Sequence, residues 1–135
     1  MKKLVLFCTI LFIFGCSAHN PFIIKNTTDI SPISNNKYAA HTDKIFITKT
    51  ALPSEVEYEV LEQIEIGKVW YGSKGNIKES LANRARQIGA DAIVNFKSWH
   101  QPSGWSWAAP HGSGTAVKIE DKSTVNFSVL EGEWY

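Results

Sequence analysis

The order of apolar patterns along the chain predicts an α+β fold, with one helix packed on a small mixed β-sheet. Two observations support this prediction. The chain has 135 residues, which suits a single hydrophobic core. Segments with β-type alternation lie on both sides of one segment with helical spacing.

Three β segments are expected before the helix. Residues 45–48 form a short β-prone run, and apolar and acidic residues alternate over 56–60, which predicts a half-buried strand. After a phase slip near Leu61, residues 64–71 resume β character, with Gly67 at a bend or bulge, so two strands or one bent strand fit this region equally well. Glutamates in this region are typical of a solvated strand face, and the alternative is an acidic surface for a cation or a basic partner. They are Glu55, Glu57, Glu59, Glu62 and Glu65.

The helix has clear predicted ends. Asn76 is expected as the N-cap, Glu79 completes a capping box, and Gly89 is expected as a left-handed C-cap. Apolar residues spaced by four, four and three form its buried stripe: Ile77, Leu81, Ala85 and Ile88. The polar residues expected to face water are Lys78, Asn83, Arg84, Arg86 and Gln87.

A long-looped hairpin and a final strand are expected after the helix. The hairpin strands are predicted at 91–99 and 114–119. Turn-forming residues between them predict a loop: Pro102, Gly104, Pro110 and Gly112. Alternation over 125–129 predicts the last strand.

The N-terminus has the features of a secretory signal. Two lysines precede an apolar run over residues 4–14, about 11 residues, whereas a membrane-spanning helix needs about 20. Gly15 and Cys16 follow this run directly. The sequence Ile13-Phe14-Gly15-Cys16 resembles the bacterial lipobox. We therefore expect three segments: a signal peptide over 1–15, a lipidated flexible tether over 16–43 and a domain over 44–135.

Lipidation of Cys16 has consequences for location and stability. In lipoproteins of this type the cysteine carries a diacylglycerol and a further acyl chain such as palmitate, which together anchor the protein in the membrane. Ser17 replaces the aspartate that retains enteric lipoproteins at the inner membrane, so we expect an outer-membrane anchor and a domain facing the periplasm. The alternative is cleavage after Ala18. Since Cys8 lies in the signal, no disulfide is expected in the domain.

The charge of the chain gives no indication of nucleic-acid binding. The formal net charge is +1, and loss of Lys2 and Lys3 with the signal lowers it by two, to −1. The sequence also lacks the motifs of hydrolase elbows, metalloproteases and phosphate loops, so no catalytic residue, enzyme activity or cofactor is expected. An enzyme acting on peptidoglycan remains the third-ranked alternative.

Tryptophans gather in the expected hairpin loop, at Trp99, Trp105 and Trp107. An indole combines a large contact area with an N–H donor, so these residues are candidates for binding an envelope protein or the sugars of peptidoglycan. The alternative is that they cover an undersized core.

Two histidines of the same region, His100 and His111, are expected to face one another across the hairpin. Neutral imidazoles bind transition metals, so an alternative function is a periplasmic metal-binding module. No cysteine or carboxylate at a recognisable spacing adds a further ligand.

Two segments resemble known families. They are residues 81–94, which contain Ile88-Gly89-Ala90-Asp91-Ala92-Ile93-Val94, and residues 112–117, Gly-Ser-Gly-Thr-Ala-Val. Both segments are similar to those of RcsF-type envelope lipoproteins and of the YbjQ-like heavy-metal-binding domain family, over about residues 45–119. The resemblance implies the same fold and a non-enzymatic role in envelope sensing or partner binding. RcsF-type domains carry disulfides that this chain cannot form, and YbjQ-like proteins are generally cytoplasmic.

Overall fold

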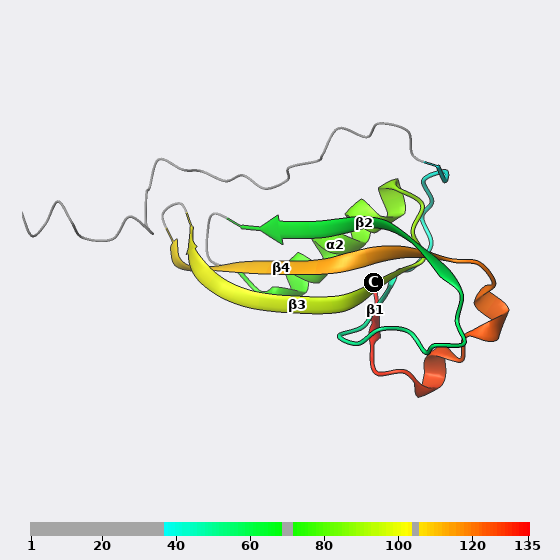
Figure 1. The fold of residues 1–135 in the computed structure, drawn as a ribbon. Coiled ribbons are helices and arrows are strands. Elements are labelled where there is room, and N and C mark those ends of the chain that lie inside the picture. The colour runs from blue at the N-terminus through cyan, green and yellow to red at the C-terminus, as the bar shows by residue number, and fades with distance from the viewer. Residues whose placement is uncertain (1–36, 69–71, 104–105) are drawn as a thin grey trace, which may run out of the picture.

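A computed structural model describes residues 37–68, 72–103 and 106–135. One helix packs on a five-stranded mixed sheet, as expected, and the strands lie in the order β2-β4-β3-β1-β5 (Figure 1). The strands are β1 (Phe46–Ile47), β2 (Tyr58–Gly67), β3 (Ala92–Ser103), β4 (Ser106–Ile119) and β5 (Glu133–Trp134). The helix is α2 (Lys74–Gln87), and two 3-10 helices are η1 (Lys122–Thr124) and η2 (Phe127–Val129). β1 pairs in parallel with β3, and the other pairs are antiparallel.

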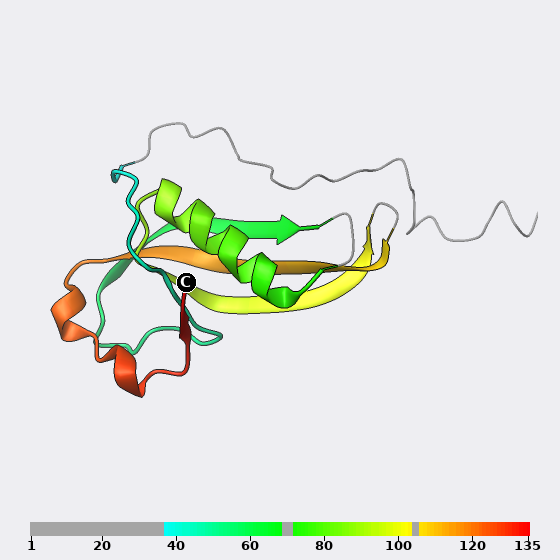
Figure 2. The ribbon, with the colours of Figure 1, turned by 180° about the vertical axis from the view of Figure 1, so that it is seen from behind.

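Each face of the sheet has its own hydrophobic core. Helix α2 covers one face, seen from the front in Figure 2, and packs on Ile64, Ile93 and Phe96. On the opposite face, the segments before β2 and after β4 cover one end only. The core there contains Phe46, Leu52, Val56, Val94, Val117, Ile119 and Val125. The remainder of that second face carries polar side chains and one tryptophan, Trp99.

The predicted helix is confirmed, but its first residue and the burial of Arg84 differ from the prediction. The four stripe residues are buried, and Gly89 has a φ of 78°, the left-handed conformation expected of it. The helix begins at Lys74 after Ser73, so Asn76 is not its cap and the predicted capping box is wrong. Arg84 was expected in water but is buried. Its guanidinium donates to both carboxylate oxygens of Glu62 on β2, at 3.2 and 2.8 Å, which ties the helix to the sheet.

Glycines on β4 allow α2 to approach the sheet. A Cβ at Gly112 would lie 2.5 Å from Cγ2 of Ile77 on the helix, and a Cβ at Gly114 would overlap the side chain of Ile93. Small residues at these two positions therefore make room for the large aliphatic side chains around them.

The predicted long loop is wrong, because β3 and β4 continue through it to Ser103 and from Ser106. Pro102 lies in a part of β3 whose outer side pairs with no described strand, at an irregularity in the pairing with β4 between Gln101 and Ser103, and such edge positions tolerate proline. The carbonyl oxygen of Pro110 accepts a hydrogen bond from the Lys68 N–H at 3.0 Å. Pro102, Pro110 and Gly112 are therefore part of a long hairpin, and Gly104 lies outside the described residues.

The phase slip predicted near Leu61 is confirmed as a bulge in β2. Val60 pairs with Val117, but Glu62 pairs with the adjacent Ala116, so Leu61 is the extra residue. The bulge places Ile64 and Ile66 on the helix face.

The predicted strand over 125–129 is wrong, since the 3-10 helix η2 lies in this segment and η1 lies directly before it. Asp121 and Asn126 accept from the N–H of the residues two positions later, Ser123 and Ser128, and these local bonds replace strand pairing. The alternation reflects packing of Val125 and Phe127 against the second core. The last strand lies later, at β5.

Part of the segment expected to be a flexible tether packs on the domain. The Tyr38 hydroxyl donates to Glu59 at 2.7 Å, and the His41 Nε2 bonds the carbonyl of Ala90 at 2.6 Å. Tyr38 and Ala39 also lie against Gly89 at the end of the helix. Residues 38–41 of the expected tether therefore pack on the domain, because these side chains find partners that the local sequence does not reveal.

Candidate functional site

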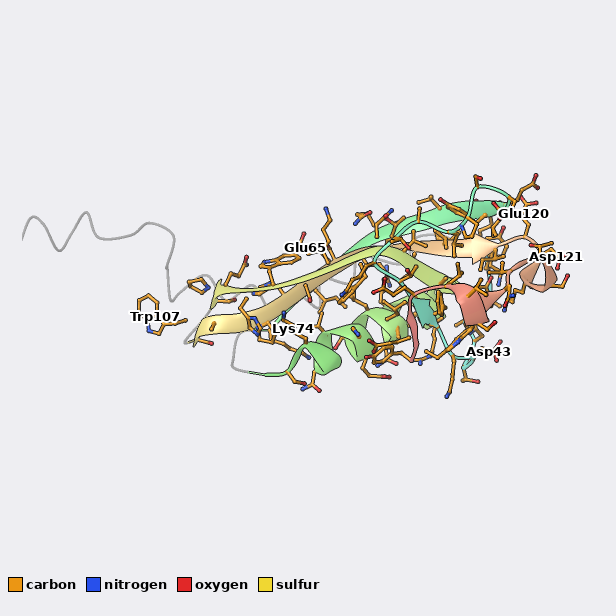
Figure 3. The ribbon with its side chains drawn as sticks, turned by 90° about the horizontal axis from the view of Figure 1, so that it is seen from below. Asp43, Glu65, Lys74, Trp107, Glu120 and Asp121 are labelled. Atoms are coloured by element: carbon orange, nitrogen blue, oxygen red, sulfur yellow. The ribbon has the colours of Figure 1, made fainter. Side chains whose placement is uncertain are left out.

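The tryptophans and histidines of interest lie on a hairpin, not in a loop. Trp99 and His100 belong to β3, and Trp107 and His111 belong to β4. Figure 3 shows Trp107 at the far end of this hairpin, beyond the start of α2 at Lys74. The candidates Trp105 and Cys16 lie outside the described residues.

The expectation that the two imidazoles face one another is wrong. In the strand register His111 is opposite Trp99, whereas His100 is opposite Pro110. Adjacent residues of a strand point to opposite faces, so the two histidines lie on opposite sides of the hairpin. Over residues 37–68, 72–103 and 106–135, no group of three or more histidines, cysteines or carboxylates is placed to hold a metal ion.

A polar surface lies on the second face of the sheet, beyond the core that covers its other end. Glu65 points away from α2 on this side (Figure 3). We call it the open sheet face, because its side chains are exposed or half-buried apart from that of His111. Its members are Gln63, Glu65, Lys97, Trp99, Gln101, His111, Ser113 and Thr115.

A bulge at Asn95 decides that Trp99 lies on this face. Val94 pairs with Thr115 and Lys97 with Ser113, so β3 has one residue more than β4 over this stretch. Asn95 has a φ of 54°, a left-handed conformation that asparagine tolerates better than most residues. Strict alternation from the buried Val94 would have turned Trp99 toward the helix. The bulge reverses this and places Trp99, Gln101 and His111 together.

These three side chains form a directed hydrogen-bond chain. The Trp99 Nε1–H, which can only donate, bonds Oε1 of Gln101 at 2.8 Å. The amide nitrogen of Gln101 therefore faces Nδ1 of His111, at 3.5 Å, and donates to it. Since a neutral imidazole has one donor and one acceptor, the proton of His111 is assigned to Nε2.

His111 is a buried donor without a partner. Its side chain stacks on the Trp99 ring, with centroids 5.9 Å apart, and only 5% of the residue is exposed. Burial lowers the pKa of His111 below its ordinary value, against the opposing effect of the Glu65 carboxylate, so the ring is neutral at neutral pH. Its Nε2 is buried and has no hydrogen-bond partner among the described residues. Such a group costs about 1–3 kcal/mol.

Charge on the open sheet face is balanced. Glu65 and Lys97 lie on either side of Ser113 in one row across three strands. The remaining members carry no charge at neutral pH, and the Thr115 hydroxyl donates to Gln63 at 2.7 Å. The face therefore offers amide and hydroxyl groups around one indole, with no net charge to attract nucleic acid or an anionic membrane.

Comparisons with protein-family models, with characterised proteins and with solved structures find no match for this chain. Within the described part of the chain, no helix has the length and hydropathy needed to cross a membrane.

Sequence reasoning identified Trp99 and His111 but missed Gln101, Lys97, Glu65 and Ser113. Their common position depends on two bulges, at Leu61 and Asn95, which change the face of every later residue on their strands. An asparagine inside a β-prone run was the available signal for the second bulge.

Proposed function

We propose that this protein is an outer-membrane lipoprotein, anchored through Cys16 with its domain facing the periplasm. Its role is non-enzymatic: hairpin β3/β4 binds a protein or cell-wall partner, in keeping with the resemblance to RcsF-type envelope lipoproteins. The sequence suggests a binding role for the tryptophans, and the exposed position of Trp107 on this hairpin supports it. His100 and His111 lie on opposite faces of the hairpin, an arrangement that does not favour the alternative of a shared metal site.

The observation that carries this proposal is the exposure of Trp107. This indole is 70% exposed at the end of a hairpin that projects away from both cores (Figure 3). A tryptophan at such a position contributes little to covering the described cores, and exposed tryptophans are enriched at binding sites. A projecting hairpin is also accessible to a large partner such as the cell wall.

Replacing Trp107 with alanine is expected to reduce partner capture about tenfold or more, in line with tryptophan hot spots. The measurement is crosslinking in intact cells, followed by identification of crosslinked proteins by mass spectrometry and of wall fragments by amino-sugar analysis. The matched control is Val129→Ala, since Val129 is 74% exposed but lies on η2, outside the hairpin. Unchanged capture in a folded Trp107→Ala variant would refute the proposed role of the hairpin.

The anchor is tested separately. In Cys16→Ser cells we expect the protein to lose its acyl chains and to leave the outer-membrane fraction, because a serine hydroxyl cannot replace the thiol that carries the lipid. Fractionation and intact-mass measurement report both effects. Wild-type protein without added lipid mass, cleaved after Ala18, would show that the alternative signal site is used.

A further inference from the structure

We propose that the open sheet face binds a neutral glycan built of N-acetylated sugars, with Trp99 as its stacking platform. The inference rests on the proposed function and names the class of ligand. Three side chains, Trp99, Gln101 and His111, support it by their chemistry, and so does the balanced charge around them.

Trp99 offers a supported aromatic surface. Its indole stacks on His111 at an interplanar angle of 21°, and its N–H is already bonded to Gln101. The ring is therefore held from two sides, and what remains for a partner is apolar ring surface. Pre-organised side chains lose little entropy on binding. The C–H face of a pyranose ring is an apolar surface that matches an indole.

The groups around the indole suit a polyhydroxylated ligand. Gln63, Gln101 and Ser113 present amide and hydroxyl groups, which can each donate and accept, as sugar hydroxyls do. Glu65 and Lys97 balance in charge, so neither an anionic nor a cationic polymer is favoured. An apolar peptide side chain would need an apolar pocket, but the members of this face other than Trp99 are polar or charged.

The buried N–H of His111 is an independent sign that a ligand completes this face. The direction of the hydrogen-bond chain makes Nε2 a donor, and it has no acceptor. The carbonyl oxygen of an acetamido group is a strong neutral acceptor. Nε2 is covered in this structure, so the acetamido oxygen reaches it only when a neighbouring side chain other than the Trp99 platform moves aside.

The test uses the full-length protein in detergent micelles and chitotetraose, a neutral tetramer of N-acetylglucosamine, titrated by calorimetry. Trp99→Ala is expected to weaken binding at least tenfold. His111→Phe keeps an aromatic ring for stacking but removes the N–H, and is expected to weaken binding about fivefold. The control is His100→Ala, adjacent in sequence but on the opposite face, with less than a twofold change.

Other results of these experiments would overturn the inference or separate it from the proposed function. Equal binding of N-acetyl-tetraalanine amide, with the same dependence on Trp99, would assign the face to peptides and overturn the inference, as would undetectable binding of chitotetraose. Glycan binding that survives in both Trp99→Ala and His111→Phe would also overturn it. If chitotetraose fails while capture in cells still depends on Trp107, the proposed function stands and the glycan assignment alone is wrong.

Discussion

Gly89→Ala is expected to lower the free energy of unfolding by about 3 kcal/mol, from the cost of a left-handed alanine and from overpacking. Gly89 ends the helix with a φ of 78°. A Cβ there would lie 2.5 Å from the Tyr38 Cβ and 2.8 Å from the Ala39 carbonyl oxygen. The substitution therefore strains the backbone and also pushes the N-terminal segment away from the domain. Urea denaturation measures the loss.

Two further variants separate these causes. Gly75→Ala lies in the first turn of the same helix, where the new Cβ would be 3.6 Å from the Ser73 Oγ, and is expected to be neutral or stabilising. Gly89→Asn relieves much of the left-handed strain but keeps the clash, so it should recover only part of the loss. Equal stability of the Gly89→Ala and Gly75→Ala variants would contradict the packing argument.

The second large effect is expected at Asp91, which joins the end of the helix to the sheet. Asp91 is 5% exposed, and its carboxylate accepts from Lys118 at 3.1 Å, from Lys122 at 2.6 Å and from the Ile119 N–H at 3.1 Å. In Asp91→Asn an amide N–H₂ replaces one acceptor oxygen, so it faces either the two ammonium groups that bond Oδ1 or the Ile119 N–H that bonds Oδ2. We expect a loss of about 2 kcal/mol, below the usual range for a fully buried pair because both lysines are partly solvated.

The stabilisation that the Asp91 carboxylate contributes depends on pH. Burial alone would raise the pKa of Asp91, but hydrogen bonds from Lys122, Lys118 and the Ile119 N–H outweigh it and hold the pKa below its ordinary value. The stabilisation is therefore complete above the unfolded pKa of about 3.9 and disappears as the pH falls through the lower folded value.

Unfolding measured between pH 7 and pH 2 should show this dependence. The gap between wild type and Asp91→Asn is expected to stay constant down to about pH 5 and to narrow below about pH 4. Asp43→Asn makes the same change of charge at an exposed position and serves as the control. A gap that does not narrow in acid would show that the Asp91 carboxylate is not the source of the stabilisation.

Local patterns sufficed where neighbouring residues decide the conformation. The helix face, the left-handed Gly89 and the slip at Leu61 follow from spacing and from glycine's freedom at positive φ, and the structure confirms all three. The prediction from the prolines was wrong, because the effect of a proline on a strand depends on pairing partners distant in the sequence. Pro102 and Pro110 suggested a loop, but the long hairpin accommodates both.

The sequence by itself determined an α+β domain, the helix with its buried stripe, and the presence of tryptophans and histidines in one region. Only the tertiary structure decided which of them share a surface. The bulge at Asn95 turns Trp99 away from the helix face, and the strand register separates His100 from His111. The physical reason is the two-residue period of a strand: one extra residue reverses the face of every residue that follows, and long-range pairing decides where that residue is inserted.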